Sequence, residues 1–212
     1  MKGAGMIALV SGGCKNGKSY YAQHLAKELA GEGRLYYIAT MIPHDEEDLA
    51  RIRRHIGERE GWGFETIEQG KNIGELVAGG TAGAGEARQI DLSGTFLFDS
   101  VTAVMENEMY PVALKERPEG AGGTGGGQEI VFLGEDPEAP ARVTGDCIAF
   151  ASAVREAGGS VVFVSDGIYG DGGEYSQSTE SYRAALAGAD RAIAAAADRV
   201  IEISYGIAEE WK

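Results

Sequence analysis

The chain has 212 residues, of which 43% are hydrophobic, and a formal net charge of −14 at pH 7. This length suffices to bury a substantial core, and we expect a single domain spanning residues 1–212. The acidic balance argues against nucleic acid or an anionic membrane as a general partner, because both require basic surface. No apolar run approaches the roughly 18 residues of a membrane span.

The two cysteines, Cys14 and Cys147, make neither a disulfide framework nor a spaced metal site. Residues 1–11 carry one lysine and a short apolar run that continues into a glycine-rich loop, so we interpret them as a strand rather than a signal peptide. We therefore expect a cytoplasmic protein.

The first recognisable motif is a Walker A loop that follows the apolar strand at residues 6–10. Backbone N–H groups must meet phosphate oxygens at close range in such a loop, which requires glycine. Lys18 is expected to reach the terminal phosphates, and the Ser19 hydroxyl to bind a Mg²⁺ ion that bridges phosphate oxygens. A chance match in a glycine-rich chain is disfavoured by the strand before the loop and the helical pattern after it. The predicted nucleotide-binding residues are Gly12, Gly13, Cys14, Lys15, Asn16, Gly17, Lys18 and Ser19.

The rest of the chain alternates between strand and helix patterns. Expected strands lie at 35–40, 64–68, 95–99, 160–165 and 199–204. Expected helices lie at 20–30, from 45 to about 60, 73–77, 101–110, 146–157 and 178–197. Residues 111–144, rich in glycine and proline, are interpreted as a flexible excursion, and residues 205–212 as a short tail. This alternation predicts a doubly wound, mostly parallel α/β sheet.

Ligands of such sheets lie at the carboxyl ends of the strands, where Ser19, Thr40, Asp99 and Asp166 are expected. Asp99 has the position of a Walker B acid, which holds Mg²⁺ through water or acts as a base. An alternative role is the N-cap of the following helix, for which Asp99 and Ser100 are both suited. Thr40 is equally well explained as an ordinary strand end.

The second helix is unusually basic for so acidic a protein. Arg51, His55 and Arg59 follow one another at intervals of four residues, which places them on one helical face suited to an anion. A histidine there is a candidate phosphate ligand, proton carrier or nucleophile, because neutral imidazole can attack phosphorus. The alternative is a solvated face whose cations pair with the helix's own glutamates. The charged neighbours are Arg53, Arg54, Glu46, Glu47 and Glu58.

Taken together, these motifs resemble the bifunctional adenosylcobinamide kinase/adenosylcobinamide-phosphate guanylyltransferase family of cobalamin biosynthesis. The most specific match is the Arg51-Ile52-x-x-His55 helix after Tyr37-Ile38-Ala39-Thr40. The other matching stretches are 11–19, 45–47, 64–68, 96–99, 181–183 and 194–200. Two departures stand out: the family has Asn-Glu where this chain has Asp166-Gly167, and Asn where it has Asp190.

The resemblance implies a RecA-like P-loop fold, GTP, ATP and Mg²⁺ as cofactors, corrinoid substrates and a homo-oligomer, typically a trimer. It implies phosphorylation of adenosylcobinamide, then GMP transfer from GTP through a guanylylated His55, with Lys18 and Asp99 also catalytic. The positions that match guanine-nucleotide contacts are Thr40, Ile56, Gly57, Glu58, Arg59, Glu68 and Asp99. Two other functions stay open, a P-loop kinase or NTPase without guanylyl transfer and a non-catalytic GTP-binding regulatory module. Whether ATP or GTP donates the phosphate is also open.

Overall fold

The computed structural model describes residues 5–43, 46–77, 90–116, 128–170 and 172–212, and within them it leaves aside several side chains, including those of Arg51, His55 and Glu58. The strands are β1 (Ile7–Gly12), β2 (Leu35–Ala39), β3 (Phe64–Glu68), β4 (Thr95–Asp99), β5 (Val112–Glu116), β6 (Gln128–Phe132), β7 (Ser160–Asp166), β8 (Arg199–Ser204) and β9 (Ile207–Glu210). The helices are α1 (Lys18–Ala30), α2 (Glu46–Glu58), α3 (Val101–Met109), α4 (Ala139–Glu156) and α5 (Gln177–Ala196), with a 3₁₀ turn, η1 (Ile73–Leu76).

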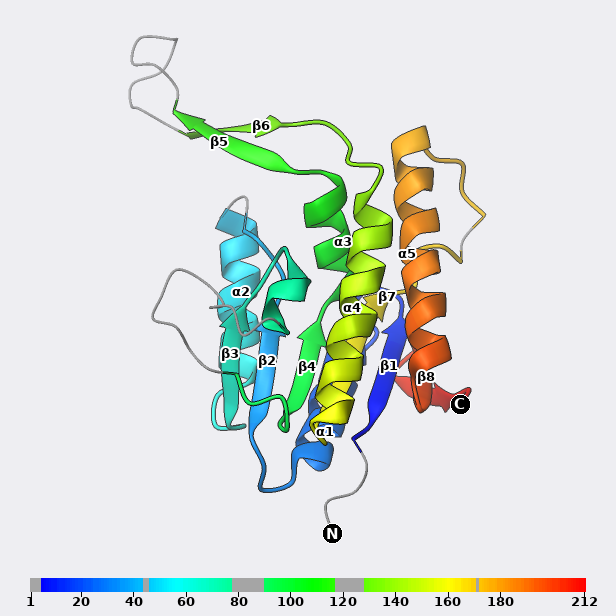
Figure 1. The fold of residues 1–212 in the computed structure, drawn as a ribbon. Helices are drawn as coiled ribbons and strands as arrows, with labels where there is room; N and C mark the ends of the chain where they lie inside the picture. Colours follow the sequence, from blue (N-terminus) through cyan, green and yellow to red (C-terminus); the bar gives the residue numbers. More distant parts are fainter. Residues whose placement is uncertain (1–4, 44–45, 78–89, 117–127, 171) are drawn as a thin grey trace.

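Seven strands form the main sheet in the order β3-β2-β4-β7-β1-β8-β9, and every neighbouring pair is parallel except β8 and β9 (Figure 1). The central strands are almost continuously apolar because helices bury both of their faces. The Walker A loop follows β1 at the carboxyl end of the sheet. This order, with β7 and β4 between β1 and β2, is the RecA-like P-loop arrangement, so the predicted fold class is confirmed.

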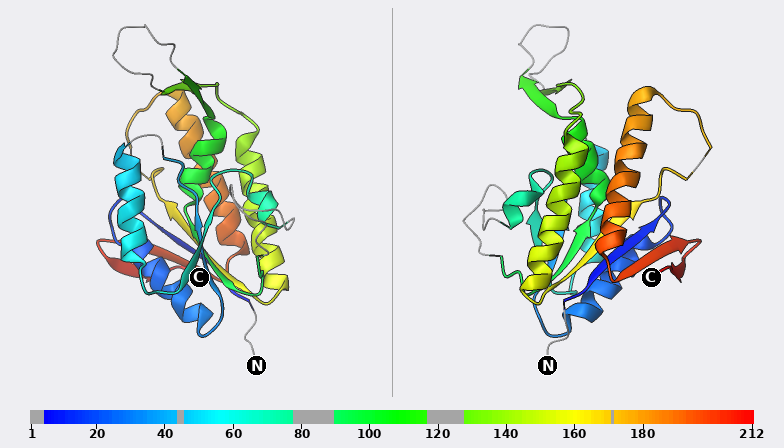
Figure 2. Two further views of the ribbon diagram at one scale, coloured as in Figure 1. Left: turned by 90° about the vertical axis from the view of Figure 1, so that its left-hand side faces the viewer. Right: turned by 45° about the vertical axis from the view of Figure 1, so that its right-hand side comes forward.

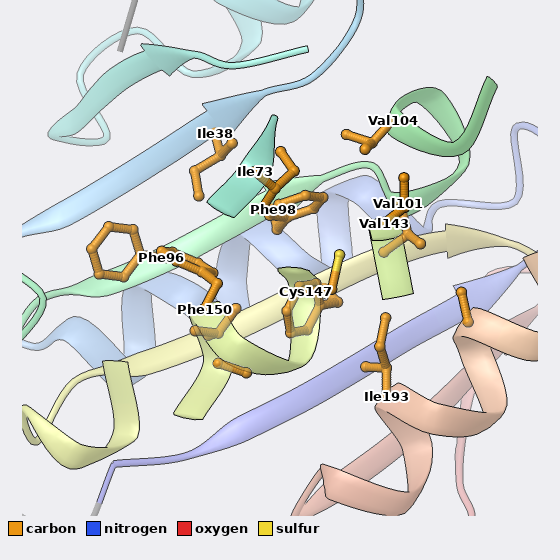
Figure 3. Packing of buried hydrophobic residues seen from close by; sticks show 14 of the residues in the cluster. Ile38, Ile73, Phe96, Phe98, Val101, Val104, Val143, Cys147, Phe150 and Ile193 are labelled. Atoms are coloured by element: carbon orange, nitrogen blue, oxygen red, sulfur yellow. The ribbon is translucent and has the colours of Figure 1, made fainter. Parts of the chain in front are cut away.

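Helices cover the two faces of the sheet unequally (Figure 2). One face packs against α3, α4 and α5 and contains the larger core, in which Phe96, Phe98 and Phe150 lie close together (Figure 3). The other face packs mainly against α1 through Ala22 and Leu25. This second core also contains Tyr37, whose hydroxyl extends to the edge of the sheet described below.

The structure differs from the predicted excursion at residues 111–144. Strands β5 and β6 pair antiparallel into a ribbon that projects beyond the main sheet (Figure 1), and α4 begins at Ala139 rather than near residue 146. The earlier helix start has a simple reason: Pro140 stands in the first turn of α4, where its missing N–H costs no hydrogen bond. The glycine run at 120–127 lies outside the described residues.

The expected C-terminal tail instead forms strand β9, which pairs with β8. The turn between them has Tyr205 at φ 53° and Gly206 at φ 76°. Two consecutive positive φ values are typical of the two-residue type I′ hairpin turn, whose twist matches that of the flanking strands. Within the described part of the chain, no helix has the length and apolar character required to cross a bilayer.

Candidate active site at the carboxyl edge of the sheet

The Walker A loop is fixed by contacts with its own residues and with β8. The Asn16 side chain donates a hydrogen bond to the Ile203 carbonyl oxygen, and its Oδ1 accepts one from the Lys18 backbone N–H at 3.2 Å. A Cβ atom at Gly12 would overlap both the Ile203 carbonyl oxygen and the Asn16 side chain. Glycine is therefore required at position 12 because the main chain passes directly against the end of a neighbouring strand.

The loop then turns sharply into α1, which begins at Lys18. Gly17 precedes the helix with φ 95°, and Lys15 has φ 56°, a left-handed conformation that is uncommon for a residue with a Cβ atom. These conformations turn the backbone of the loop toward the helix N-terminus, where unpaired N–H groups and the helix dipole favour phosphate. Gly13 and Cys14 are exposed on the same loop.

Lys18 is nearly buried and is held by two oxygen atoms. Its Nζ lies 3.1 Å from the Gly13 carbonyl oxygen and 2.5 Å from Asp166 Oδ1. Asp166 is the last residue of β7, and its backbone N–H donates to Thr102 Oγ1 at 2.8 Å. The carboxylate thus stands at the end of the strand next to β1, where it and a bound phosphate would share one ammonium group.

Strands β3, β2 and β4 bring a second group of predicted residues to the same edge. The register places Glu68 beside Ala39, and Ala39 beside Asp99. Thr40 follows directly but is fully buried, and its hydroxyl exchanges hydrogen bonds with the backbone of Ser100. The Thr40 side chain therefore holds β2 against the start of α3, and a contact with nucleotide stays a prediction for this residue.

Asp99 is not the N-cap of α3. Ser100 has that role, because its Oγ accepts a hydrogen bond from the Ala103 N–H at 3.3 Å. Asp99 Oδ2 instead accepts a hydrogen bond from the Tyr37 hydroxyl at 2.9 Å. Burial is the main cause that raises the pKa of Tyr37, and the nearby Asp99 carboxylate raises it further. The phenol therefore keeps its proton at neutral pH and remains a hydrogen-bond donor.

Arg59 connects the end of α2 to this pair. Its guanidinium carbon lies 3.4 Å from the centre of the Tyr37 ring, and the residue is only 7% exposed. Arg59 Nη1 is buried and has no hydrogen-bond partner among the described residues. A buried guanidinium N–H without an acceptor is costly, and an anionic ligand would satisfy it.

The remaining predicted residues of α2 are placed only in part. Ile56 and Gly57 are exposed on the last turn of the helix. His55 stands four residues before Arg59 and Glu58 directly before it, but both side chains lie outside the described residues, as does that of Arg51. The sheet order separates the two groups, since β7 and β4 lie between the Walker A strand and β2.

The two groups supply oxygen donors that suit Mg²⁺. Ser19 offers a hydroxyl and Asp99 a carboxylate, the hard ligands that this ion prefers. No cluster of three or more metal-ligating side chains occurs among the residues that the structure describes. The residues therefore fit a Mg²⁺ ion held mainly by nucleotide phosphates and water, with few protein ligands.

Two features of this edge are absent from the sequence-based site. Tyr37 is an ordinary strand residue in the sequence, and no pattern there marks its hydroxyl as a partner of Asp99.

Asp190 in α5 is buried and accepts hydrogen bonds from Ser165 Oγ and Tyr169 OH, each at 2.9 Å, while its Oδ1 has no partner among the described residues. Burial raises the pKa of Asp190 to about 6.

Comparison with known proteins agrees with these observations. The family model described as cobinamide kinase / cobinamide phosphate guanyltransferase matches residues 8–210. The chain belongs to this family. A curated relative, the bifunctional adenosylcobalamin biosynthesis protein CobU of Escherichia coli K12, is 37% identical over 73 residues. That alignment spans 34% of this chain and 38% of the relative.

Solved structures of similar shape are more distant in sequence. The flagellar accessory protein FlaH of Methanocaldococcus jannaschii is 13% identical with a TM-score of 0.46, and the match covers 98% of this chain and 76% of that protein. A KaiC-like protein of Pyrococcus horikoshii OT3 is 14% identical with a TM-score of 0.45, and the match covers 94% of this chain and 71% of that protein.

Proposed function

We propose that this member of the family catalyses two reactions at the carboxyl edge of its sheet. The first is nucleotide-dependent phosphorylation of adenosylcobinamide, and the second is transfer of GMP from GTP to the product through a guanylylated His55. The observation that carries the proposal is the buried Arg59 guanidinium, which is stacked on the tyrosine that hydrogen-bonds Asp99 and whose Nη1 has no partner among the described residues. The family match over residues 8–210 supports it.

In the kinase step, the Walker A amides and Lys18 bind the β- and γ-phosphates, and Ser19 and Asp99 are the residues that would hold Mg²⁺. The ion, when bound, supplies charge neutralisation at the phosphate oxygens. The corrinoid hydroxyl oxygen attacks the γ-phosphorus, the bond to the β–γ bridging oxygen breaks, and the hydroxyl proton passes to Asp99. Tyr37 holds that carboxylate through its hydrogen bond.

In the transfer step, a neutral His55 nitrogen attacks the α-phosphorus of GTP and the bond to the pyrophosphate leaving group breaks. A phosphate oxygen of the phosphorylated corrinoid then attacks the same phosphorus, and the histidine–phosphorus bond breaks. Arg59 would stabilise negative charge on the α-phosphate during both attacks. The neutral imidazole is the nucleophilic form that this step requires.

Incubation with GTP labelled at the α-phosphate tests the transfer step. We expect acid-labile, base-stable label on the wild-type protein and none on His55→Ala, with His44→Ala as the matched control that keeps its label. Absence of label on the wild type, together with γ-phosphate transfer that Lys18→Ala abolishes, would identify a kinase or NTPase without guanylyl transfer. Nucleotide binding without any turnover would identify a regulatory module.

The oligomeric state belongs to the same proposal. We propose a homo-oligomer, a trimer by family resemblance, which light scattering of the purified protein measures directly. A cytoplasmic location is likewise proposed.

A further inference from the structure

A cavity of about 520 Å³ adjoins the Walker A loop on the side of β8. Its volume lies within the roughly 300–1,000 Å³ of small-molecule sites. The lining comes from the start of α1 and from the end of β8 with its turn into β9: Gly17, Tyr20, Tyr21, His24, Ile203 and Gly206. One of the loop glycines is therefore part of the wall, which makes the cavity continuous with the phosphate-binding loop.

The chemistry of this lining suits an uncharged aromatic group. None of the six residues carries a carboxylate, an ammonium or a guanidinium, so the cavity is not built for phosphate. Tyr20 is 65% exposed, and its ring meets the His24 ring edge to face, with 4.4 Å between centroids. His24 packs in the same way against Trp62, with 4.7 Å between ring centroids.

The turn between β8 and β9 carries a second exposed aromatic residue. Tyr205 is 99% exposed in the β8–β9 turn, next to the lining residue Gly206. An exposed aromatic ring that flanks a phosphate site offers a face on which a nucleotide base can stack. The turn is held close to the loop, because Asn16 bonds the Ile203 carbonyl oxygen.

We infer that this cavity binds the purine base of the nucleotide that donates phosphate in the kinase step, with the base stacked on Tyr20 and covered by Tyr205. The inference rests on the proposed kinase function. Sheet order places β8, whose end lines the cavity, on the opposite side of β1 from β2 and β3, which carry Thr40 and Glu68 near their ends. In this proposal the two nucleotides share one phosphate loop.

Two variants remove the aromatic surface without disturbing the core. Tyr20→Ala removes the stacking ring, and Tyr205→Asn removes the second ring while keeping a residue that tolerates positive φ. Each is expected to weaken ATP binding by about tenfold or more, the effect typical of losing an aromatic stacking partner. Tyr20→Phe should bind ATP nearly as the wild type does. Titration calorimetry with ATP and with inorganic tripolyphosphate measures base and phosphate contributions separately.

Trp211→Ala serves as the control, because Trp211 is an exposed aromatic residue beside Val200, at the end of β8 far from the turn. Tripolyphosphate affinity and α-labelling of His55 by GTP should be unchanged in both tyrosine variants. The assignment would be overturned if both tyrosine variants bound ATP as tightly as the wild type. It would also be overturned if they lost as much affinity for tripolyphosphate as for ATP. If ATP binding weakens as expected but no corrinoid is phosphorylated by the wild type, the proposed kinase function fails while the base site stands.

Discussion

Lys18 and Asp166 form an ion pair at the phosphate loop, with 2.5 Å between Nζ and Oδ1. The lysine comes from the Walker A motif and the acid from the end of β7, the strand next to β1. The carboxylate competes with phosphate for the ammonium and repels the phosphate charge.

Replacing Asp166 by Asn should therefore tighten nucleotide binding. We expect the Kd for ATP to fall by about three- to tenfold, since one partly exposed charge contact is worth on the order of 1 kcal/mol. Titration calorimetry at two salt concentrations measures the effect, which should shrink at high salt. Asp166→Glu is the control that keeps the charge. Weaker binding by Asp166→Asn would show that the acid instead serves the ligand, for example through Mg²⁺.

Gly12 and Gly13 provide a matched pair for the phosphate loop. A methyl group at Gly12 would overlap the Ile203 carbonyl oxygen and the Asn16 side chain, whereas one at Gly13 meets no atom within 4 Å. Gly12→Ala should lose about 1–3 kcal/mol of unfolding free energy, because the loop and β8 must shift to accept it. Gly13→Ala should retain nearly full stability. Urea denaturation of both variants tests this, and equal stabilities would contradict it.

Asp190 should make stability depend on pH. Its pKa rises from 3.8 to about 6 in the folded protein because the carboxyl is buried. The folded state then binds more protons than the unfolded state between about pH 4 and 6, so this residue lowers stability as pH rises through that window. Above about pH 6 the penalty is constant, on the order of 3 kcal/mol for a shift of about two pKa units.

Asp190→Asn removes that titration while keeping an oxygen acceptor for Ser165 and Tyr169. We expect the variant to exceed the wild type in unfolding free energy by about 1–3 kcal/mol near pH 8 and to match it near pH 4. Urea unfolding at both pH values measures the difference. A difference that does not change with pH would mean that Asp190 is not protonated in this range.

Arg59 should be essential for guanylyl transfer, and a lysine at this position should not substitute for it. The planar guanidinium stacks on Tyr37 and offers several N–H groups, whereas an ammonium has neither property. Arg59→Lys is expected to slow α-labelling of His55 by about 10- to 100-fold in single-turnover experiments. Arg53→Lys, at an exposed position of α2, should label at the wild-type rate. Equal rates in the two variants would remove Arg59 from the site.

The sequence alone determined the fold class and most of the nucleotide loop. Apolar strands alternating with amphipathic helices require a parallel sheet, and local spacing suffices to mark residues 12–19 and an acid at the end of a strand. The sequence does not predict strands β5, β6 and β9. These strands are short, and neighbouring glycine and proline residues obscure their alternating pattern. They are stabilised by pairing with another strand rather than by a local preference.

Only the tertiary structure decided the partners of the site residues. Tyr37 with Asp99, Lys18 with Asp166 and Asn16 with Ile203 each join residues far apart in the chain. The same holds for Tyr20 and Gly206, which line one cavity from α1 and the last hairpin. Strand order and register determine which chain ends meet at one edge of a sheet, and burial then determines which polar groups must find partners. Both are properties of the folded chain as a whole, and no local pattern in the sequence contains them.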